Sequence, residues 1–226
     1  RVPIAITGAS AFVGRALLPR LAAAYPDARL RALVMPGDPL AAGLGDLVPG
    51  RLETVDGDVT VAPTVDRLVA GASRVLHLAG LISYWRLETA RLQAVNVEGT
   101  RNVVEACVRA GVGRLLHVSS VGAIGFRSDG TPADEDEPFN WPDSLPYMTT
   151  KRAGQQVVQD AVRDVRLDAV IVTPASVMGP GDPNPATPPP EIDYEFWLGP
   201  APWKPYTPGR CHGHGGVGWY HIRDYS

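Results

Sequence analysis

The stretch VPIAITGASAFVG, residues 2–14, decides the fold of this chain. It begins with a short apolar run, as in a strand of a parallel sheet that is buried on both faces, and ends in a loop bounded by Gly8 and Gly14. The helical pattern that follows carries Ala16, Leu17, Leu18 and Leu21. The pyrophosphate of a dinucleotide binds where a strand, a glycine loop and a helix follow in this order, because backbone N–H groups at the helix start meet its negative charge. We therefore predict a Rossmann-type α/β domain.

Further apolar runs alternate with longer helical patterns up to about Thr173, which is typical of βαβ units. The predicted strands are Val2–Ile6, Arg29–Val34, Leu52–Val55, Arg74–Leu78, Leu115–Ser119 and Ala169–Thr173, and each is expected to be buried on both faces. The clearest helix is predicted from about Glu88 to Ala110, with Gly111 as its C-cap and a stripe of Leu92, Val95, Gly99, Val103, Ala106 and Ala110. The expected fold is a doubly wound parallel sheet.

The charge balance favours small-molecule partners. The 226 residues include 21 Lys and Arg against 24 Asp and Glu, a net charge of −3, and the basic residues are scattered, so we expect no nucleic-acid partner. No apolar run approaches the roughly 20 residues of a membrane span, so we expect no membrane partner. Cys107 and Cys211 lie far apart, which suits a reducing cytoplasm. A strand follows Arg1 at once, which predicts the absence of a signal peptide.

Composition changes after Gly179. Ten of the 22 prolines lie between Pro180 and Pro208, and eight of the 16 aromatic residues lie between Pro188 and Ser226. We predict an irregular tail over residues 183–226 that is a piece of a folded domain, since disordered linkers are poor in aromatics. Cys211, His212 and His214 within that tail lack a nearby fourth ligand, so no metal site is expected.

Three polar residues suggest acid–base chemistry. Tyr147 and Lys151 are four residues apart at the start of a predicted helix, so they share one face, and an ammonium beside a phenol favours its ionised form. Ser120 ends the fifth strand, at the edge where open α/β sheets bind ligands. Two simpler interpretations stay open at this point, a solvated surface pair and a glycine loop that only turns the chain. Asn96, within the long helix, is expected to satisfy backbone groups.

Residues 1 to about 182 resemble the extended short-chain dehydrogenase/reductases, including dihydroflavonol-reductase-like and sugar-epimerase-like members. The resemblance rests on seven pieces in family order, namely residues 7–14, 57–59, 77–80, 95–100, 118–120, 147–151 and 174–180. It implies the catalytic residues Ser120, Tyr147 and Lys151. It also implies the cofactor-binding residues Gly8, Ser10, Ala11, Phe12, Val13, Gly14, Asp58, Val59, Leu78, Ala79, Gly80, Lys151, Pro174 and Val177.

The implied cofactor is NAD or NADP. Ala11 stands where the glycine pattern has its middle glycine, and it adds a methyl group close to the expected phosphate. The end of the second strand, where an acid would bind a ribose hydroxyl and an arginine a 2′-phosphate, carries Val34 and Met35 instead. The phosphate preference therefore stays open.

The tail does not continue this resemblance. The C-terminal substrate lobe expected after residue 180 is missing, and residues 188–226 are instead similar to a fragment of the glucose-fructose oxidoreductase and inositol dehydrogenase family. We interpret the chain as a junction of two gene fragments, with its seam between about Asp182 and Pro190.

The resemblance implies hydride transfer on a carbonyl or alcohol carbon of a sugar-nucleotide, flavonol-like or sterol-like substrate, by an oxidoreductase or epimerase. Truncation of that enzyme in this chain stays open at this point. Its relatives commonly pair as homodimers. The alternatives are a non-catalytic dinucleotide-binding module and a non-functional chimera.

Overall fold

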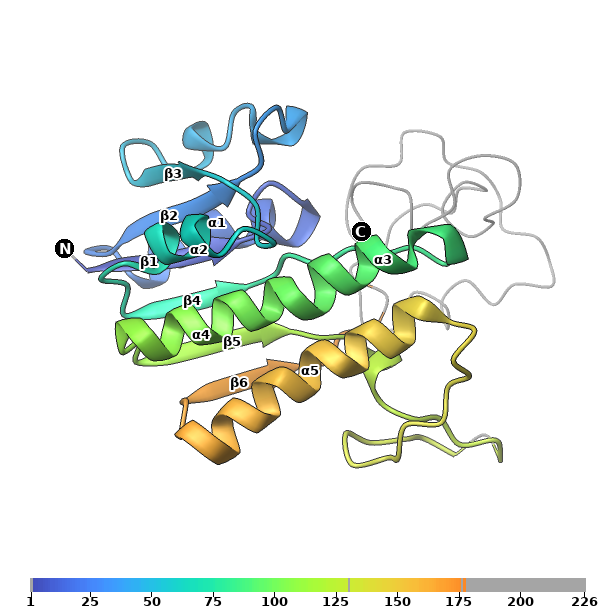
Figure 1. Ribbon diagram of the computed structural model, residues 1–226. Coiled ribbons are helices and arrows are strands. Elements are labelled where there is room, and N and C mark those ends of the chain that lie inside the picture. Colours follow the sequence, from blue (N-terminus) through green and yellow to red (C-terminus); the bar gives the residue numbers. More distant parts are fainter. Residues whose placement is uncertain (1, 130, 176, 178–226) are drawn as a thin grey trace. The chain divides into compact units, whose positions relative to one another are not determined.

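The computed structural model describes residues 2–129, 131–175 and 177. The tail over residues 183–226 and the Cys211, His212 and His214 group lie outside them. The described strands form one parallel sheet in the order β3-β2-β1-β4-β5-β6, which confirms the α/β prediction (Figure 1). The strands are β1 (Pro3–Thr7), β2 (Arg29–Val34), β3 (Leu52–Asp56), β4 (Arg74–His77), β5 (Arg114–Val118) and β6 (Ala169–Val172).

Helices lie on both faces of the sheet. Helix α1 (Phe12–Ala24) packs on one face, where Leu18 and Leu21 meet Ile4 and Ile6. Helices α2 (Ala62–Val69), α4 (Thr100–Ala110) and α5 (Pro146–Val165) cover the other face, which is turned toward the viewer in Figure 1. Among the residues that the structure describes, no helix combines the length and apolarity that a membrane span needs.

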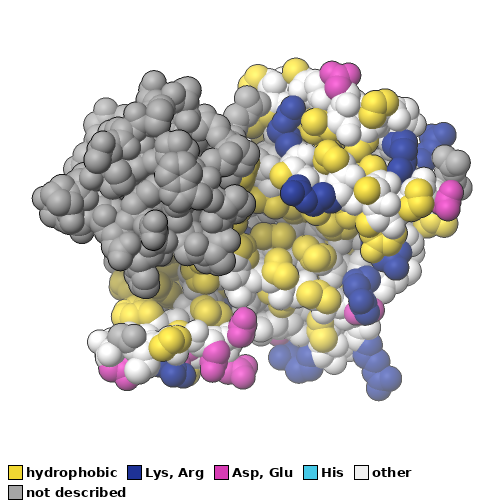
Figure 2. Space-filling view, turned by 180° about the vertical axis from the view of Figure 1, so that it is seen from behind, with side chains coloured by type: hydrophobic (Ala, Val, Ile, Leu, Met, Phe, Trp, Pro, Cys, Tyr) yellow, Lys and Arg dark blue, Asp and Glu magenta, His cyan; other side chains and the backbone are white. Residues whose placement is uncertain are grey.

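The two edge strands are less buried than the sequence pattern predicts. On β6, Ala169 and Ile171 pack under the helices, but Val170 and Val172 on the opposite face are 42% and 39% exposed. Every residue of β3 is also only partly buried or exposed. Figure 2 views the face that carries α1, and hydrophobic side chains are visible on it. Apolar runs do not distinguish an edge strand from a central one, so the prediction of burial on both faces was wrong for β3 and β6.

The predicted helix from Glu88 to Ala110 has an irregular middle. A short helix α3 (Thr89–Leu92) leads into a π-helical segment, Gln93–Gly99, which continues as α4. Gly111 ends the helix with φ 64°, as the predicted C-cap requires. Ala110 was expected in the buried stripe and is exposed instead, because it lies in the last turn beside the chain's exit from the helix.

Candidate dinucleotide and catalytic site

The strand order reverses between β1 and β4, and open α/β sheets bind ligands at the carboxyl ends of strands at such a point. Gly8 follows β1 there with φ +70°, and a Cβ atom on it would lie 2.8 Å from the backbone nitrogen of Ala79. A Cβ atom on Gly14 would lie 2.3 Å from the carbonyl oxygen of Gly8. Both positions therefore require glycine, and together they hold the β1–α1 loop close to the end of β4. This arrangement fits a dinucleotide pyrophosphate.

A buried chain of hydrogen bonds joins the ends of β1 and β4. The backbone N–H of Ala79 donates to Thr7 Oγ1 over 3.1 Å, and Thr7 Oγ1 lies 2.7 Å from His77 Nδ1. On the other side of the ring, His77 Nε2 lies 3.0 Å from Thr100 Oγ1, whose own proton goes to the carbonyl oxygen of Asn96. Thr100 has one hydroxyl proton, so Nε2 must donate and Nδ1 must accept. Burial lowers the pKa of His77 to about 3, which keeps this ring neutral.

Asn96 anchors the segment that follows β4. Its Oδ1 accepts from the backbone nitrogen of Leu81 over 2.7 Å, and its Nδ2 donates to Leu81 O over 3.0 Å and to Thr150 Oγ1 over 3.2 Å. The expectation that this side chain satisfies backbone groups agrees with these contacts. Gly154 on α5 leaves room for the arrangement, since a Cβ atom there would lie 2.3 Å from Asn96 O.

Replacing Asn96 with alanine is expected to lower the free energy of unfolding by about 2 kcal/mol, because the N–H and C=O groups of Leu81 lose their partner together. Urea denaturation measures this loss. Gln93→Ala is the matched control, since Gln93 lies exposed in the same π-helical segment and should change stability little. Equal stabilities of the two variants would contradict the anchoring role.

The predicted catalytic residues Ser120 and Tyr147 meet at the end of β5. Ser120 Oγ accepts from the backbone nitrogen of Gly122 over 3.1 Å and also hydrogen-bonds the Tyr147 side chain. The Tyr147 ring is buried, and the Tyr84 ring packs against it edge-on with centroids 5.6 Å apart. Burial raises the pKa of Tyr147, and the hydrogen bond from Ser120 opposes that rise.

Lys151 lies one turn further along α5 and is also buried. Its Nζ donates to the carbonyl oxygen of Val118 over 3.0 Å, and burial lowers the pKa of Lys151 to about 8. Desolvation of the phenol is the largest influence on the pKa of Tyr147 and raises it, so the lowering of that pKa by Lys151 stays a prediction. Gly80 borders the same ammonium, since a Cβ atom there would lie 3.6 Å from Lys151 Nζ.

Asp58 and Val59, two of the predicted cofactor-binding residues, lie in the turn before α2. Asp58 Oδ1 accepts from the backbone nitrogen of Thr60 over 2.9 Å, which closes a turn before the helix. Val59 is buried against Gly99, where a Cβ atom would come within 2.8 Å of Val59 Cγ2. The described contacts of these two side chains are thus with their own turn and with the neighbouring helix.

The other predicted cofactor-binding residues lie after β4, after β6 and in the glycine loop. Leu78 and Ala79 lie directly after β4 against Gly8, and Pro174 O accepts from Val121 N, beside Ser120, over 3.1 Å. Val177 is exposed. Residues 8–14 run from the end of β1 into α1, with Ser10 partly buried and Ala11 exposed, and Phe12 and Val13 begin the helix.

Sequence reasoning did not assign roles to Thr100 and Tyr84. Thr100 shares the buried His77 network, and Tyr84 contacts the candidate catalytic tyrosine. Thr100 is the last residue of the 95–100 stretch on which the family resemblance rests. That position could have marked Thr100 as a residue with a role in the site. No sequence pattern marks Tyr84, because its contact with Tyr147 forms between segments far apart in the chain.

Residues 4–191 match the family described as the NAD dependent epimerase/dehydratase family. The chain belongs to this family. Residues 177–223 also match a second family, described as the C-terminal alpha/beta domain of an oxidoreductase family, and all of them except Val177 lie outside the described residues.

Several curated proteins and solved structures are similar to this chain. Human 3 beta-hydroxysteroid dehydrogenase type 7 is 35% identical over 78% of this chain and 50% of its own length. Ceramide reductase of Caulobacter vibrioides is 37% identical over 79% of this chain and 47% of its own length. A short-chain dehydrogenase/reductase superfamily protein from Agrobacterium tumefaciens, crystallised with bound NAD, is 30% identical with a TM-score of 0.63 over 76% of this chain and 48% of its own. The chain thus spans about half the length of these relatives.

Proposed function

We propose that this protein is an NAD-dependent oxidoreductase that transfers a hydride between the nicotinamide ring and the carbon of an alcohol or carbonyl group. The observation that carries the proposal is the hydrogen-bonded pair of Ser120 and Tyr147, with Lys151 on the same helix. The glycine loop at the strand-order reversal supports it, as do relatives whose names describe a dehydrogenase of hydroxysteroids and a reductase of ceramide.

The chain's own residues supply proton transfer and orientation. NAD⁺, held at the glycine loop bounded by Gly8 and Gly14, would supply the acceptor for the hydride of the carbinol carbon. Tyr147 exchanges the proton of the substrate oxygen, so an alcohol and NAD⁺ become a ketone, NADH and one proton. Ser120 accepts the Gly122 N–H, which leaves its own proton free to orient the tyrosine or substrate oxygen.

We propose NAD rather than NADP as the cofactor because two arginines, one on β2 and one on α1, are already engaged by other groups. Arg31, within β2, donates to the carbonyl oxygens of Leu68 and Ala70 and forms an ion pair with Glu53. Arg15, on α1, donates to the carbonyl oxygen of Leu40 over 2.9 Å. A 2′-phosphate would have to displace one of these contacts to gain a counter-charge.

Fluorescence titration with NADH and NADPH tests the proposal. We expect NADH to bind at least about tenfold more tightly than NADPH, because an unpaired phosphate costs at least about 1.4 kcal/mol. Gly14→Ala should abolish NADH binding, since its methyl group meets Gly8 O, while Ala11→Gly should tighten it by removing the exposed methyl.

Gly45→Ala is the matched control, because nothing lies within 4 Å of a Cβ atom there and its φ is not positive. Circular dichroism establishes that each variant is folded. Wild-type chain that is folded but binds neither nucleotide would overturn the proposal. NADH binding without turnover on any secondary alcohol would favour the non-catalytic binding module.

We also propose that residues 1–182 form the dinucleotide-binding domain and residues 183–226 a separate tail. The family matches to residues 4–191 and 177–223 support this boundary, since their overlap contains Asp182 and Pro190. Limited proteolysis with mass spectrometry tests it: cleavage concentrated near residue 182 is expected, and a first cleavage within the sheet would contradict the boundary.

A cytoplasmic location and a homodimer complete the proposal. The location is supported by Cys107, a free, buried thiol whose pKa burial raises to about 12.

The homodimer is supported by the resemblance and by the exposed apolar side chains of Val108 on α4 and of Val162 and Val165 on α5. Light scattering of the purified chain measures the oligomeric state.

A further inference from the structure

Tyr84 packs against the candidate catalytic tyrosine. The rings of Tyr84 and Tyr147 meet edge-on, with centroids 5.6 Å apart and an interplanar angle of 61°, which is a favourable geometry for an aromatic pair. Tyr147 is 8% exposed, whereas Tyr84 is 49% exposed. The Tyr84 ring therefore covers part of the Tyr147 ring and is itself half in contact with solvent.

The chain segment that carries Tyr84 is held on both sides of this residue. Before it, the backbone N–H and C=O groups of Leu81 both bond to the side chain of Asn96, over 2.7 Å and 3.0 Å. Around it, the backbone N–H of Trp85 donates to Ser83 Oγ over 3.2 Å, which closes a local turn. The backbone of Tyr84 is thus fixed by local contacts, and its ring is presented from a defined position.

Asn96 also connects this segment to the helix of Tyr147. Its Nδ2 donates to Thr150 Oγ1 over 3.2 Å, and both of these side chains are buried. The Thr150 hydroxyl lies within hydrogen-bond distance of the carbonyl oxygens of Pro146 and Tyr147, at 2.7 Å and 3.1 Å. The backbone at Leu81 is therefore connected to the carbonyl group of Tyr147 through two buried side chains, whose hydrogen bonds are costly to break.

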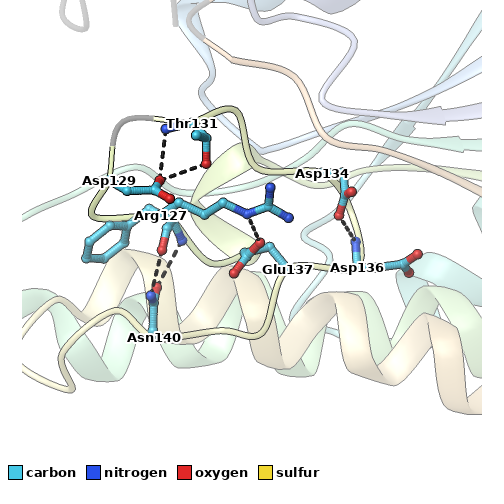
Figure 3. Close-up of polar contacts among 8 residues, drawn as sticks. Arg127, Asp129, Thr131, Asp134, Asp136, Glu137 and Asn140 are labelled. Carbon is cyan, nitrogen blue, oxygen red and sulfur yellow. Dashed lines mark hydrogen bonds and ion pairs between the residues drawn. The ribbon is translucent and has the colours of Figure 1, made fainter.

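The loop that joins Ser120 to α5 closes on itself. Asn140 Oδ1 accepts from the backbone nitrogen of Phe126 over 2.9 Å, and Asn140 Nδ2 donates to the Phe126 carbonyl oxygen over 2.7 Å. The other contacts drawn in Figure 3 also join residues of this loop to one another. They fix its backbone, whereas the Tyr147 side chain is contacted by Ser120 at the hydroxyl group and by Tyr84 at the ring.

We propose that Tyr84 is a positioning residue, whose ring holds the Tyr147 ring in the orientation in which the Tyr147 hydroxyl group meets Ser120. A tyrosine side chain turns about two torsions, so one contact at its hydroxyl group and one at its ring fix both. The ring of Tyr84 has this effect, and its hydroxyl group is not needed for it. The consequence for catalysis rests on the proposed oxidoreductase function, whereas the ring contact does not depend on turnover.

NMR spectroscopy of the full chain with ¹³C-labelled tyrosine tests the ring contact directly. The Tyr147 resonance is assigned by its loss in Tyr147→Phe. We expect Tyr84→Ala to shift this resonance, and Tyr84→Phe to leave it close to its wild-type position because phenylalanine keeps the ring. Leu87→Ala is the matched control, since Leu87 lies three residues further along the chain and is 78% exposed, and it should not move the Tyr147 resonance.

Steady-state kinetics on a secondary alcohol distinguish positioning from substrate contact. A displacement of about 1 Å at a reacting group can lower the rate about 10²-fold. We expect Tyr84→Ala to lower kcat and kcat/KM together by about 10- to 10²-fold with KM within about threefold, because proton exchange by Tyr147 occurs in the transition state. Tyr84→Phe should restore both parameters to within about threefold of wild type. Circular dichroism establishes that each variant is folded.

Three outcomes would overturn the inference. The first is a Tyr147 resonance that is the same in Tyr84→Ala as in wild type. The second is a raised KM at unchanged kcat, which would make Tyr84 a substrate contact, and the third is a Tyr84→Phe variant as impaired as Tyr84→Ala, which would assign the effect to the hydroxyl group. Failure of the proposed function has a different signature, in which Tyr84→Ala moves the Tyr147 resonance but the wild type oxidises no secondary alcohol.

Discussion

Tyr147→Phe is expected to lower kcat/KM for alcohol oxidation by about 10³-fold while leaving NADH binding unchanged. The variant keeps the buried ring and its edge contact with Tyr84, and it removes only the hydroxyl group that hydrogen-bonds Ser120. Steady-state kinetics on a secondary alcohol, together with the NADH titration, measure the two effects separately. Tyr25→Phe removes a hydroxyl group far along the sequence from the site, just after α1, and should leave the kinetics unchanged.

The pH dependence supplies a second test of Tyr147. Burial raises the pKa of this phenol above its ordinary value near 10, so its base form is scarce at neutral pH. The kcat/KM of the wild type for oxidation should therefore rise with pH up to about pH 8, where Lys151 begins to lose its proton, because this parameter follows the ionisation of the free enzyme. Activity of Tyr147→Phe within tenfold of wild type, with the same pH profile, would assign proton transfer to another group.

Lys151→Met is expected to lower turnover by at least about 10²-fold and yet to make the protein more stable at pH 7. Burial lowers the pKa of Lys151 from 10.5 to about 8, so holding its charge in the fold costs on the order of 3 kcal/mol. Methionine has a similar length and carries no charge. The net gain should be about 1 to 2 kcal/mol, because Val118 O loses its donor.

The pH dependence of this gain follows from proton binding. Between pH 8 and 10.5 the unfolded chain binds more protons at Lys151 than the folded chain, so wild-type stability rises with pH in that window. The advantage of Lys151→Met should be largest below pH 8 and disappear as pH passes 10.5. Urea denaturation at pH 7 and pH 10 measures it, and a variant less stable than wild type at pH 7 would show that the ammonium group stabilises the fold.

Local sequence patterns were sufficient to predict the order and positions of the strands. Each predicted strand agrees with the structure to within one residue at either end, as Val2–Ile6 against Pro3–Thr7 illustrates. Apolar runs and glycines act through neighbouring residues, so strand, loop and helix can be predicted without knowing what packs on them. The same locality explains the wrong prediction for β6, because exposure of Val170 depends on which strands and helices lie beside it.

Some residues of the candidate site could be predicted from the sequence, and others could not. Gly8, Gly14, Ser120, Tyr147 and Lys151 could be named from sequence, because strand ends and a four-residue helical spacing place them. The π-helical turn at Asn96 and its bonds to Leu81 could not be predicted, because they join segments that meet only after folding.

Residue spacing and glycine placement were thus enough to predict a doubly wound sheet with a glycine loop, and the family resemblance implied the Ser–Tyr–Lys group at its carboxyl edge. Tertiary structure decided the chemical state of that group. Burial raises the pKa of Tyr147 and lowers that of Lys151, and neither shift follows from their spacing on the helix. The physical reason is that desolvation depends on everything packed around a side chain, whereas spacing along a helix depends only on the chain itself.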